Sequence, residues 1–407
     1  MIDVLIVGAG PAGAVAATLL ARRGARVLIL DRATFPRAKL CGDTVNPGTV
    51  AMLARLGLGS HLETDGLPVD GMVVTGPGGV AVAGAYPQGV RARSLTRSEL
   101  DLALLQGALA AGAQFEPGTA VRRALIEGGS KCLVGGVVAS GNRPVRARVV
   151  VAADGRHSTI AFGLGLARHP DRPRRWAIGA YFDNVARLSG TALHGEMHLR
   201  RGGYIGISPI PGGLTNVCLV ISRDTPAGPG HLGLNGPTLR DPASVLRRAL
   251  ETDPLLRDRF ASARMVTRPV MVGPLAVDVA EQGMDGLVVA GDAAGFIDPM
   301  TGDGLRFAVR GAELAAGAAH RVLEHGWTGV HTALTRARRH EFASKWRFNR
   351  LLRALVASSG AMHVGEVTAA VAPAILRAIV RHAGDCDLVR ADVLQSAATS
   401  LHKTVSS

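Results

Sequence analysis

The stretch Ile2–Asp31, "IDVLIVGAGPAGAVAATLLARRGARVLILD", decides the fold of this chain. Residues 2–7 form an apolar run typical of a strand buried in a parallel sheet, and residues 25–30 form a second such run. Between them, a glycine-rich turn leads into a helix predicted over residues 14–23, which ends at Gly24. A strand, a helix and a second strand in this order predict a βαβ unit, and therefore a parallel sheet.

The glycine-rich turn reads GAGPAG over residues 8–13. The glycines at positions Gly8, Gly10 and Gly13 allow a tight turn and let the backbone approach a pyrophosphate, while the following helix offers free N–H groups. Asp31 ends the next strand, where its carboxylate is placed to accept hydrogen bonds from a ribose 2′-OH. A negative charge there disfavours a 2′-phosphate, so the predicted ligand is FAD or NAD rather than NADP.

The composition is that of a globular protein large enough for two or three domains, because 47% of the 407 residues are hydrophobic and 19% are charged. The net charge of +14 suits nucleic acid or an anionic membrane. However, the arginines are scattered and no nucleic-acid-binding module is present, so no nucleic-acid partner is expected.

One dense basic run, residues 336–355, carries Phe342, Trp346 and Leu352 at helical spacing. Two interpretations remain open. The segment is either a surface helix packed by its aromatic side chains, or a helix that lies on an anionic bilayer and receives a lipid substrate.

The four cysteines lie far apart, with no CxxC pair or zinc spacing, so neither a disulfide framework nor a metal site is predicted. The N-terminus runs directly into the glycine turn and lacks the features of a signal peptide. No apolar run reaches 18 residues. A cytoplasmic location is therefore expected, with peripheral membrane association through residues 336–355 left open.

The pattern changes between residues 175 and 275, where short alternating strands are separated by glycine and proline turns. This pattern predicts an antiparallel sheet inserted as a second domain. The sequence GLVVAGDAAG, residues 286–295, then returns to a buried strand followed by a glycine turn.

Two further motifs follow buried strands. Residues 152–158, AADGRHS, place Asp154 at a strand end, although such a sequence is also typical of a simple turn. Asp292 lies at the carboxyl edge of the buried strand predicted within residues 286–295, where open α/β sheets bind ligands. A helix predicted from Gly304 offers free N–H groups, which suit the negative charge that a reduced flavin carries at N1 and the C2 carbonyl. Alternatively, Asp292 and Asp303 only cap helices.

These three motifs, in this order, resemble those of FAD-dependent enzymes with the p-hydroxybenzoate hydroxylase fold. Residues 35–43, FPRAKLCGD, and 291–308, GDAAGFIDPMTGDGLRFA, most resemble the geranylgeranyl reductase family. The implied fold is α/β, with a Rossmann-type FAD-binding domain, an inserted antiparallel-sheet substrate domain and C-terminal helices. The expected boundaries are 1–70, 95–165 and 280–330 for the FAD-binding domain, 71–94 and 166–279 for the substrate domain, and 331–407 for the helical region.

The resemblance also implies site residues. Around FAD these are Gly8, Gly10 and Gly13 at the pyrophosphate, Asp31 at the adenosine ribose, Arg97 and Asp154 near the phosphates, Asp292 at the ribityl chain, and Pro299, Gly302 and Gly304 along the isoalloxazine. The loop of residues 37–43 would also approach the flavin, which makes Cys41 a candidate catalytic residue. The alternatives are that Cys41 is a small buried hydrophobe and Arg97 a surface residue at a helix start.

The sequence differs from the families that it resembles in three respects. Ala161 stands where hydroxylases usually have an arginine, and YIGISPIP keeps Tyr204 and Pro209 but not the other aromatic residues of the reductase motif. The Trp-x-Trp-x-Ile-Pro stretch of flavin halogenases is missing from the sequence, which argues against halogenation.

Only one dinucleotide fingerprint is strong, and FAD is expected to occupy it. Electrons would then come from NAD(P)H bound transiently, or from a separate reductase partner. The leading hypothesis is an FAD-dependent oxidoreductase that reduces a double bond of a small hydrophobic, isoprenoid- or polyketide-like substrate. This substrate would lie between the antiparallel sheet and the flavin, facing Tyr204 or His198, unless these are packed sheet residues.

Two rival functions stay open at this point. A monooxygenase acting on an aromatic or lipid-quinone-like substrate would need a dry pocket for the flavin hydroperoxide. A non-enzyme that only carries electrons would not need an inserted substrate domain.

Overall fold

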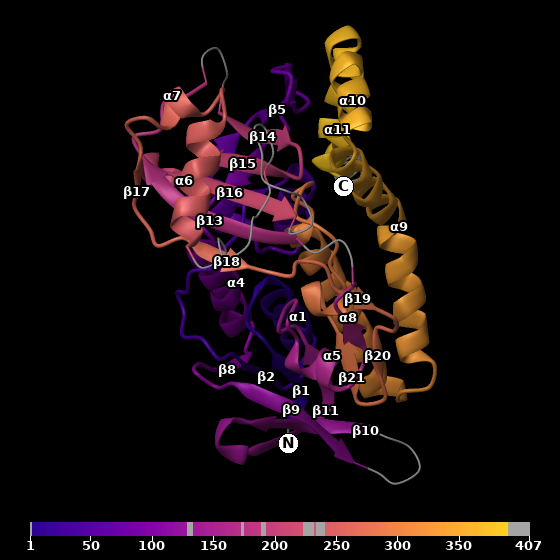
Figure 1. Ribbon diagram of the computed structural model, residues 1–407. Helices are drawn as coiled ribbons and strands as arrows, with labels where there is room; N and C mark the ends of the chain where they lie inside the picture. Colours follow the sequence, from indigo (N-terminus) through magenta and orange to yellow (C-terminus); the bar gives the residue numbers. More distant parts are fainter. Residues whose placement is uncertain are drawn as a thin grey trace, which may run out of the picture.

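The computed structural model describes residues 2–127, 133–171, 175–188, 193–222, 232 and 241–389. Two large sheets lie one above the other in Figure 1, and a long C-terminal helix runs along one side of both. Cys132 lies outside the described residues, and the other three cysteines are free thiols.

The first sheet is built around the predicted βαβ unit. Strand β1 (Ile2–Val7) pairs in parallel with β2 (Val27–Leu30) on one side and β11 (Pro144–Ala152) on the other. The sheet extends to β8 (Gln114–Glu116) and, through β11, to β21 (Leu287–Val289). The antiparallel strands β9 (Val121–Glu127), β10 (Leu133–Ala139) and β20 (Gly283–Met284) complete it.

Three helices cover one face of this sheet: α1 (Pro11–Ala21), α4 (Arg97–Ala110) and α8 (Gly304–His325). Helix α1 begins earlier than predicted, because Pro11 fits the first turn of a helix, where its missing N–H has no partner to lose. Apolar side chains of α1, α4, α8 and the sheet form one core cluster. The predicted α/β fold class is confirmed.

The second sheet is mostly antiparallel and holds the strands expected between residues 175 and 275. Its order is β17-β13-β16-β15-β14-β5-β6, with β18 beside β13. The bounds are β5 (Gly71–Thr75), β6 (Ala81–Ala85), β13 (Arg175–Asp183), β14 (His194–Arg200), β15 (Gly203–Pro209), β16 (Thr215–Ser222), β17 (Arg264–Met265) and β18 (Val270–Val272).

The second sheet is covered on both faces. Helices α6 (Pro242–Thr252) and α7 (Arg257–Phe260) pack on one face through a core that includes Ile178, Ile205 and Leu246. Side chains on the other face pack against Phe296 and Met300, which precede α8. The loop before α8 therefore lies between the two sheets.

Smaller elements connect these layers. Strands β3 (Thr44–Val45), β4 (Leu67–Val69) and β7 (Ala92–Ser94) form a three-stranded sheet, and β12 (Ala167–Arg168) pairs with β19 (Asp278–Val279). The short helices are α2 (Pro47–Arg55), α3 (Ser60–Thr64), α5 (Thr159–Gly163) and the 3-10 turn η4 (Gly291–Ala294).

The C-terminal helices are α9 (Val330–Ala357), α10 (Ser359–Val371) and α11 (Pro373–Ala383). Helix α9 packs on α8, and Figure 1 shows α10 and α11 at the top of the molecule, near β5. Phe342 of α9 is fully buried, and so are the charged Arg338 and Lys345. Among the described residues, every helix is too short or too polar to cross a membrane.

Candidate active site

The glycine turn has the geometry that a pyrophosphate requires. Gly8 has a φ of +100°, and a Cβ there would lie 2.5 Å from the carbonyl oxygen of Ala153. A Cβ on Gly13 would collide with the carbonyl oxygen of Gly8, so α1 packs on the turn only without a side chain. Space lies above Gly10, and no side chain caps α1, so its first N–H groups face that space.

Asp31 holds the same turn from the next strand. Its Oδ2 accepts a hydrogen bond of 2.7 Å from the Ala9 N–H, and its Oδ1 accepts one of 2.8 Å from the Ala33 N–H. Each carboxylate oxygen keeps a second lone pair. The position fits a ribose hydroxyl, and the ribose contact stays a prediction.

A cluster of positive side chains lies next to the turn. Arg97 is only 6% exposed and donates two hydrogen bonds to Asp101, of 2.8 and 2.9 Å. Burial would lower the pKa of Arg97, but the Asp101 carboxylate and the Cys41 sulfur hold it above its ordinary value. The Nη2 of Arg37 lies 3.1 Å from the same carboxylate and 3.5 Å from where a Cβ of Gly10 would be. Two arginines thus share one carboxylate beside Gly10, which leaves net positive charge for a diphosphate.

The surface alternative for Arg97 is therefore wrong, because its side chain is buried. From the sequence, Arg37 and Lys39 were included only as members of the loop of residues 37–43, and Asp101 was not singled out. Lys39 is accessible but closely surrounded by protein, and this desolvation lowers its pKa to about 8. The positive charge of Arg97 acts in the same direction, and the negative charge of Asp292 opposes it.

Asp292 lies in η4, directly after β21, as predicted. Its side chain is half-buried, and no residue that the structure describes donates a hydrogen bond to its carboxylate or forms an ion pair with it. Lys39 and Arg156 lie close enough to interact electrostatically with this carboxylate. A carboxylate left open in this way fits the hydroxyls of a ribityl chain.

The loop of residues 299–304 leads from this carboxylate into α8. Gly302 has a φ of +70°, Pro299 is half-buried, and Gly304 is the first residue of the helix. Asp303 occupies the N-cap position, but its carboxylate does not cap the helix. It accepts a 2.7 Å hydrogen bond from Thr301 instead and lies 3.2 Å from Lys345 Nζ. The N-terminus of α8 is thus open to a ligand with negative charge.

Asp154 completes this half of the site. Its Oδ2 accepts a 2.8 Å hydrogen bond from the Thr159 N–H, and its Oδ1 is buried with no partner among the described residues. Burial raises the pKa of this carboxyl group. A Cβ on Gly8 would lie 2.9 Å from the Asp154 Cα, so the residue borders the glycine turn. The turn, the open helix N-termini, the free carboxylates and the positive cluster together fit FAD.

Asp43 ends the loop of residues 37–43, which the sequence analysis placed near the flavin without giving Asp43 a role of its own. It is 1% exposed, its φ is +53°, and its carboxylate is held between two sheet residues. The Oδ2 accepts hydrogen bonds from the Tyr181 hydroxyl at 2.6 Å and from Asn216 Nδ2 at 2.5 Å, while the Oδ1 has no partner among the described residues. Burial raises its pKa to about 6, although both hydrogen bonds and Arg97 act to lower it.

Cys41 lies next to Asp43 in the loop of residues 37–43. Its side chain is half-buried and contacts Arg97, and its carbonyl accepts a 2.9 Å hydrogen bond from Asn216. Leu40 of the same loop packs with Tyr204 and Met300 in one cluster. The loop thus lies between the positive cluster and the second sheet, and a catalytic role of Cys41 stays a prediction.

Tyr204 joins the second sheet to the loop before α8. Its hydroxyl donates a 2.7 Å hydrogen bond to Asp298 Oδ1, and Arg175 donates a 2.9 Å one to Asp298 Oδ2. All three side chains are buried. Burial and the Asp298 charge raise the pKa of Tyr204 well above its ordinary value, so it stays neutral. Because this hydroxyl already donates its hydrogen bond to Asp298, the geometry favours a role for Tyr204 in positioning the loop rather than in proton transfer.

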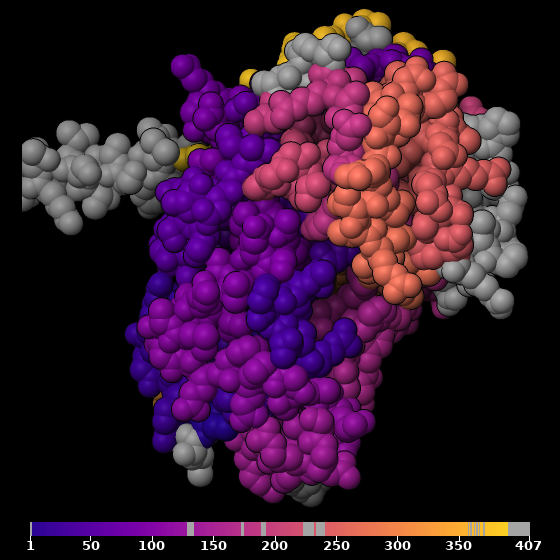
Figure 2. Space-filling view, turned by 90° about the vertical axis from the view of Figure 1, so that its left-hand side faces the viewer, coloured from indigo at the N-terminus to yellow at the C-terminus, as the bar shows by residue number. Residues whose placement is uncertain are grey.

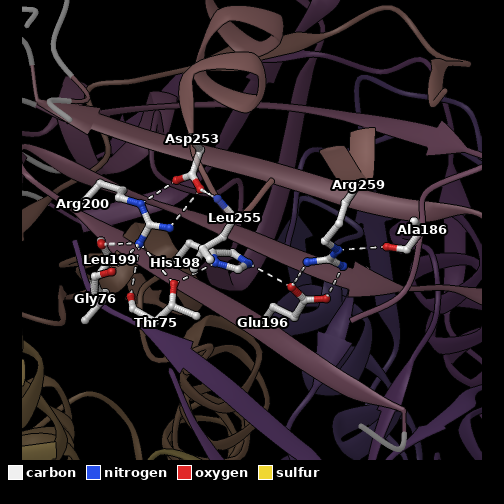
Figure 3. Close-up of polar contacts among 10 residues, drawn as sticks. All are labelled: Thr75, Gly76, Ala186, Glu196, His198, Leu199, Arg200, Asp253, Leu255 and Arg259. Carbon is white, nitrogen blue, oxygen red and sulfur yellow. Dashed lines mark hydrogen bonds and ion pairs between the residues drawn. The ribbon is translucent and has the colours of Figure 1, made fainter. Parts of the chain in front are cut away.

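His198 lies between Thr75 and Glu196 in a network of polar side chains, as Figure 3 shows. Its Nδ1 is 2.8 Å from the Thr75 hydroxyl and its Nε2 is 2.9 Å from Glu196, which is paired with Arg259. Burial would raise the pKa of Glu196, but the hydrogen bonds from His198 and Arg259 lower it. The structure therefore does not bring His198 to the site, and both its ring nitrogens are already satisfied.

The neighbours of His198 on the strand line a large apolar cavity instead. Because side chains alternate along a strand, Met197 and Leu199 face the other way. They border a cavity of about 530 Å³ between the second sheet and the C-terminal helices. Met300 and Thr301, at the loop before α8, also line it. Its other walls come from β5, β6, α9, α10 and α11.

A second pocket, of about 480 Å³, opens on the other side of the same loop. It is bordered by the backbone from Ala294 to Ile297 and by Trp346, Arg168 and Arg350. Neither arginine makes a hydrogen bond or ion pair with a described residue.

Comparison with known proteins agrees with this site. A family model described as an FAD binding domain matches residues 1–346. The chain is 33% identical over 329 residues to a menaquinone reductase of Mycobacterium tuberculosis, covering 77% of this chain and 75% of that protein. It is 31% identical over 332 residues to digeranylgeranylglycerophospholipid reductase 2 of Methanopyrus kandleri, covering 81% and 79%.

Solved structures share the fold at lower identity. A myxobacterial chondrochloren halogenase has a TM-score of 0.75 and 24% identity, and the match covers 85% of this chain and 81% of that one. A flavin-dependent brominase has a TM-score of 0.79 and 20% identity, with 95% and 94% covered. These structures show a common fold. The resemblance stated from the sequence motifs is confirmed.

Proposed function

This chain belongs to the FAD binding domain family and is an FAD-dependent oxidoreductase, and we propose that it reduces a carbon–carbon double bond in the isoprenoid chain of a lipid. The apolar cavity carries this proposal, because it reaches the loop expected to border the flavin at Met300 and Thr301. Its volume lies within the range of about 300–1,000 Å³ that ligand pockets have. The names of the related reductases, menaquinone and digeranylgeranylglycerophospholipid, support a lipid substrate.

Saturating a double bond adds a hydride to one carbon and a proton to the other. Bound reduced FAD would supply the hydride. The cavity walls would hold the apolar chain and exclude water, with Leu199 and Met197 on one side and Leu352 on the other. Residues of the protein must then provide the proton.

We assign the proton donor as Asp43. Its carboxyl group lies in the loop expected to face the flavin and is neutral more often near neutrality than an ordinary aspartate, since its pKa is raised to about 6. The Oδ1 has no hydrogen-bond partner among the described residues, so a proton on this oxygen is not shared with another group of the protein. Tyr181, which donates to Oδ2, is half-buried and connects the carboxyl group towards solvent.

The second pocket suits the electron donor. Arg168 and Arg350 offer positive charge for phosphates, Trp346 offers an aromatic face, and the pocket touches the backbone of the loop before α8. We propose that NAD(P)H docks there, and a separate reductase partner is the alternative source of electrons.

The test is anaerobic turnover. The purified protein is checked for FAD by its absorbance spectrum and given NADH or NADPH with menaquinone or a geranylgeranyl lipid. Product that gains two hydrogen atoms without oxygen would support the proposal. Product that gains an oxygen atom, only in air, would establish a monooxygenase instead. A Leu199→Trp variant, which narrows the cavity, should lose turnover of the lipid while it keeps its FAD.

A further inference from the structure

The mouth of the apolar cavity coincides with an exposed apolar surface. Ile375 lines the cavity and is also 51% exposed. On α10, Val371 is 80% exposed and Val367 is 51% exposed, and the two lie one helical turn apart. We call Val367, Val371 and Ile375 the apolar tip. Exposed aliphatic side chains are unremarkable singly, but a group of them at a cavity mouth indicates a contact surface.

The same helices carry a strong positive charge. Between residues 330 and 383 the sequence has nine arginine or lysine residues, of which Arg338 and Lys345 are buried, and only two glutamates, with no aspartate. Arg347, Arg350, Arg377 and Arg381 are exposed. An anionic surface would be attracted to this part of the molecule, whereas a second copy of the chain would bring the same charge and be repelled.

We propose that the apolar tip, with its flanking arginines, docks on an anionic lipid bilayer, so that a lipid substrate enters the cavity directly from the membrane. The inference rests on the proposed function for the nature of the substrate. Figure 1 shows α10 and α11 at the upper edge of the molecule, and Figure 2 shows yellow C-terminal residues along its top. The contact would be peripheral, with apolar side chains at the boundary of the acyl chains and arginines at the headgroups.

This location differs from the one expected from the sequence. In the segment 336–355, Phe342 is fully buried, while Trp346 and Leu352 are half-buried and line the two pockets. Its apolar face therefore packs inward. Its exposed arginines remain available, so this segment would supply charge while the apolar tip supplies the inserted side chains.

The experiment is sedimentation with vesicles. The FAD-loaded protein is mixed with vesicles of phosphatidylcholine alone or of phosphatidylcholine with phosphatidylglycerol. The double variant Val367→Asp, Val371→Asp is compared with the control Val266→Asp, Val270→Asp, whose parent residues are 42% and 45% exposed on the far sheet edge. We expect binding only to the anionic vesicles, about tenfold or more weaker for the tip variant and unchanged for the control.

Equal binding of both variants, or no preference for anionic vesicles, would overturn the inference. So would a dimer in size-exclusion chromatography that only the tip variant loses, because the surface would then join two copies. The proposed function fails separately, if the parent protein binds these vesicles but reduces no lipid in them or in detergent. With turnover established, the tip variant should lose activity on lipid in vesicles and keep it on the same lipid in detergent.

Discussion

Replacement of Asp43 by asparagine tests the proton donor through stability as well as activity. Burial raises the pKa of this carboxyl group from 3.8 to about 6, which corresponds to roughly 3 kcal/mol at about 1.4 kcal/mol per unit. The folded state binds this proton more tightly than the unfolded state. The resulting stabilisation is fully present below about pH 3.8 and is lost as the pH rises through about 6.

The parent protein should therefore lose about 2 kcal/mol of stability through this group between about pH 4.5 and pH 7.5. Asp43→Asn cannot ionise and should not show this loss. Chemical unfolding of both proteins at the two pH values measures the difference, and the other titrating groups are common to both. A difference in stability that does not change with pH would refute the raised pKa.

The activity of the same variant separates proton donation from a structural role. Above about pH 6, turnover of the parent should fall about tenfold per pH unit as Asp43 ionises, and Asp43→Asn should lose about 10²- to 10⁴-fold. Tyr181→Phe removes a hydrogen bond that lowers the pKa of Asp43, so its descending limb should move to higher pH. If Asp43→Asn keeps its FAD and retains the turnover and pH profile of the parent, Asp43 is not the donor.

Three other changes have definite expected outcomes. Asp292→Ala should weaken FAD binding about 10- to 100-fold, the value of a hydrogen bond to a charged group, and a fluorescence titration that finds equal affinity would contradict its assigned role. Leu199→Trp should raise the KM for a long isoprenoid substrate more than for a short one, because the larger side chain fills the cavity and not the place where the double bond reacts. An equal rise in KM for the two substrates would show that the isoprenoid chain binds outside this cavity. His198→Ala should lower the free energy of unfolding by about 1–3 kcal/mol, since it removes one buried hydrogen bond to Thr75 and one to Glu196, and a lower kcat at unchanged stability would show that His198 acts in catalysis after all.

The elements around the glycine turn could be predicted because their signals are local. Gly13 must be glycine because a Cβ there would meet the Gly8 carbonyl within the same turn, and Asp31 follows from the end of the next strand. Asp292 was also located correctly, because a buried apolar run followed by a glycine turn marks the end of a strand. In each case the residue and its structural reason lie within about 30 residues of each other.

The environment of Asp43 could not be predicted, because it is formed by three segments far apart in the sequence. Tyr181 comes from β13 and Asn216 from β16, and only the closed sheet brings both to one carboxylate. The side of the strand on which His198 lies could not be predicted either. The alternation along β14 was readable, but the sequence does not say which face of the strand meets the cavity.

The loop between Phe296 and Gly304 lies between the proposed substrate cavity and the expected flavin site. On the side of the second sheet, Asp298 receives hydrogen bonds from Tyr204 and Arg175. On the side of α9, Thr301 bonds Asn349, and Asp303 is paired with Lys345.

The loop is thus held from both directions by buried polar contacts, each of which would leave a charge or dipole unpaired if it were broken. Met300 and Thr301 meanwhile line the apolar cavity, while Gly302 and Gly304 open the N-terminus of α8 to a flavin. A substrate that presses on this loop also presses on the expected flavin contacts. The C-terminal helices that hold the loop also form the cavity mouth, so the proposed membrane contact, lipid entry and flavin site all depend on one packed region.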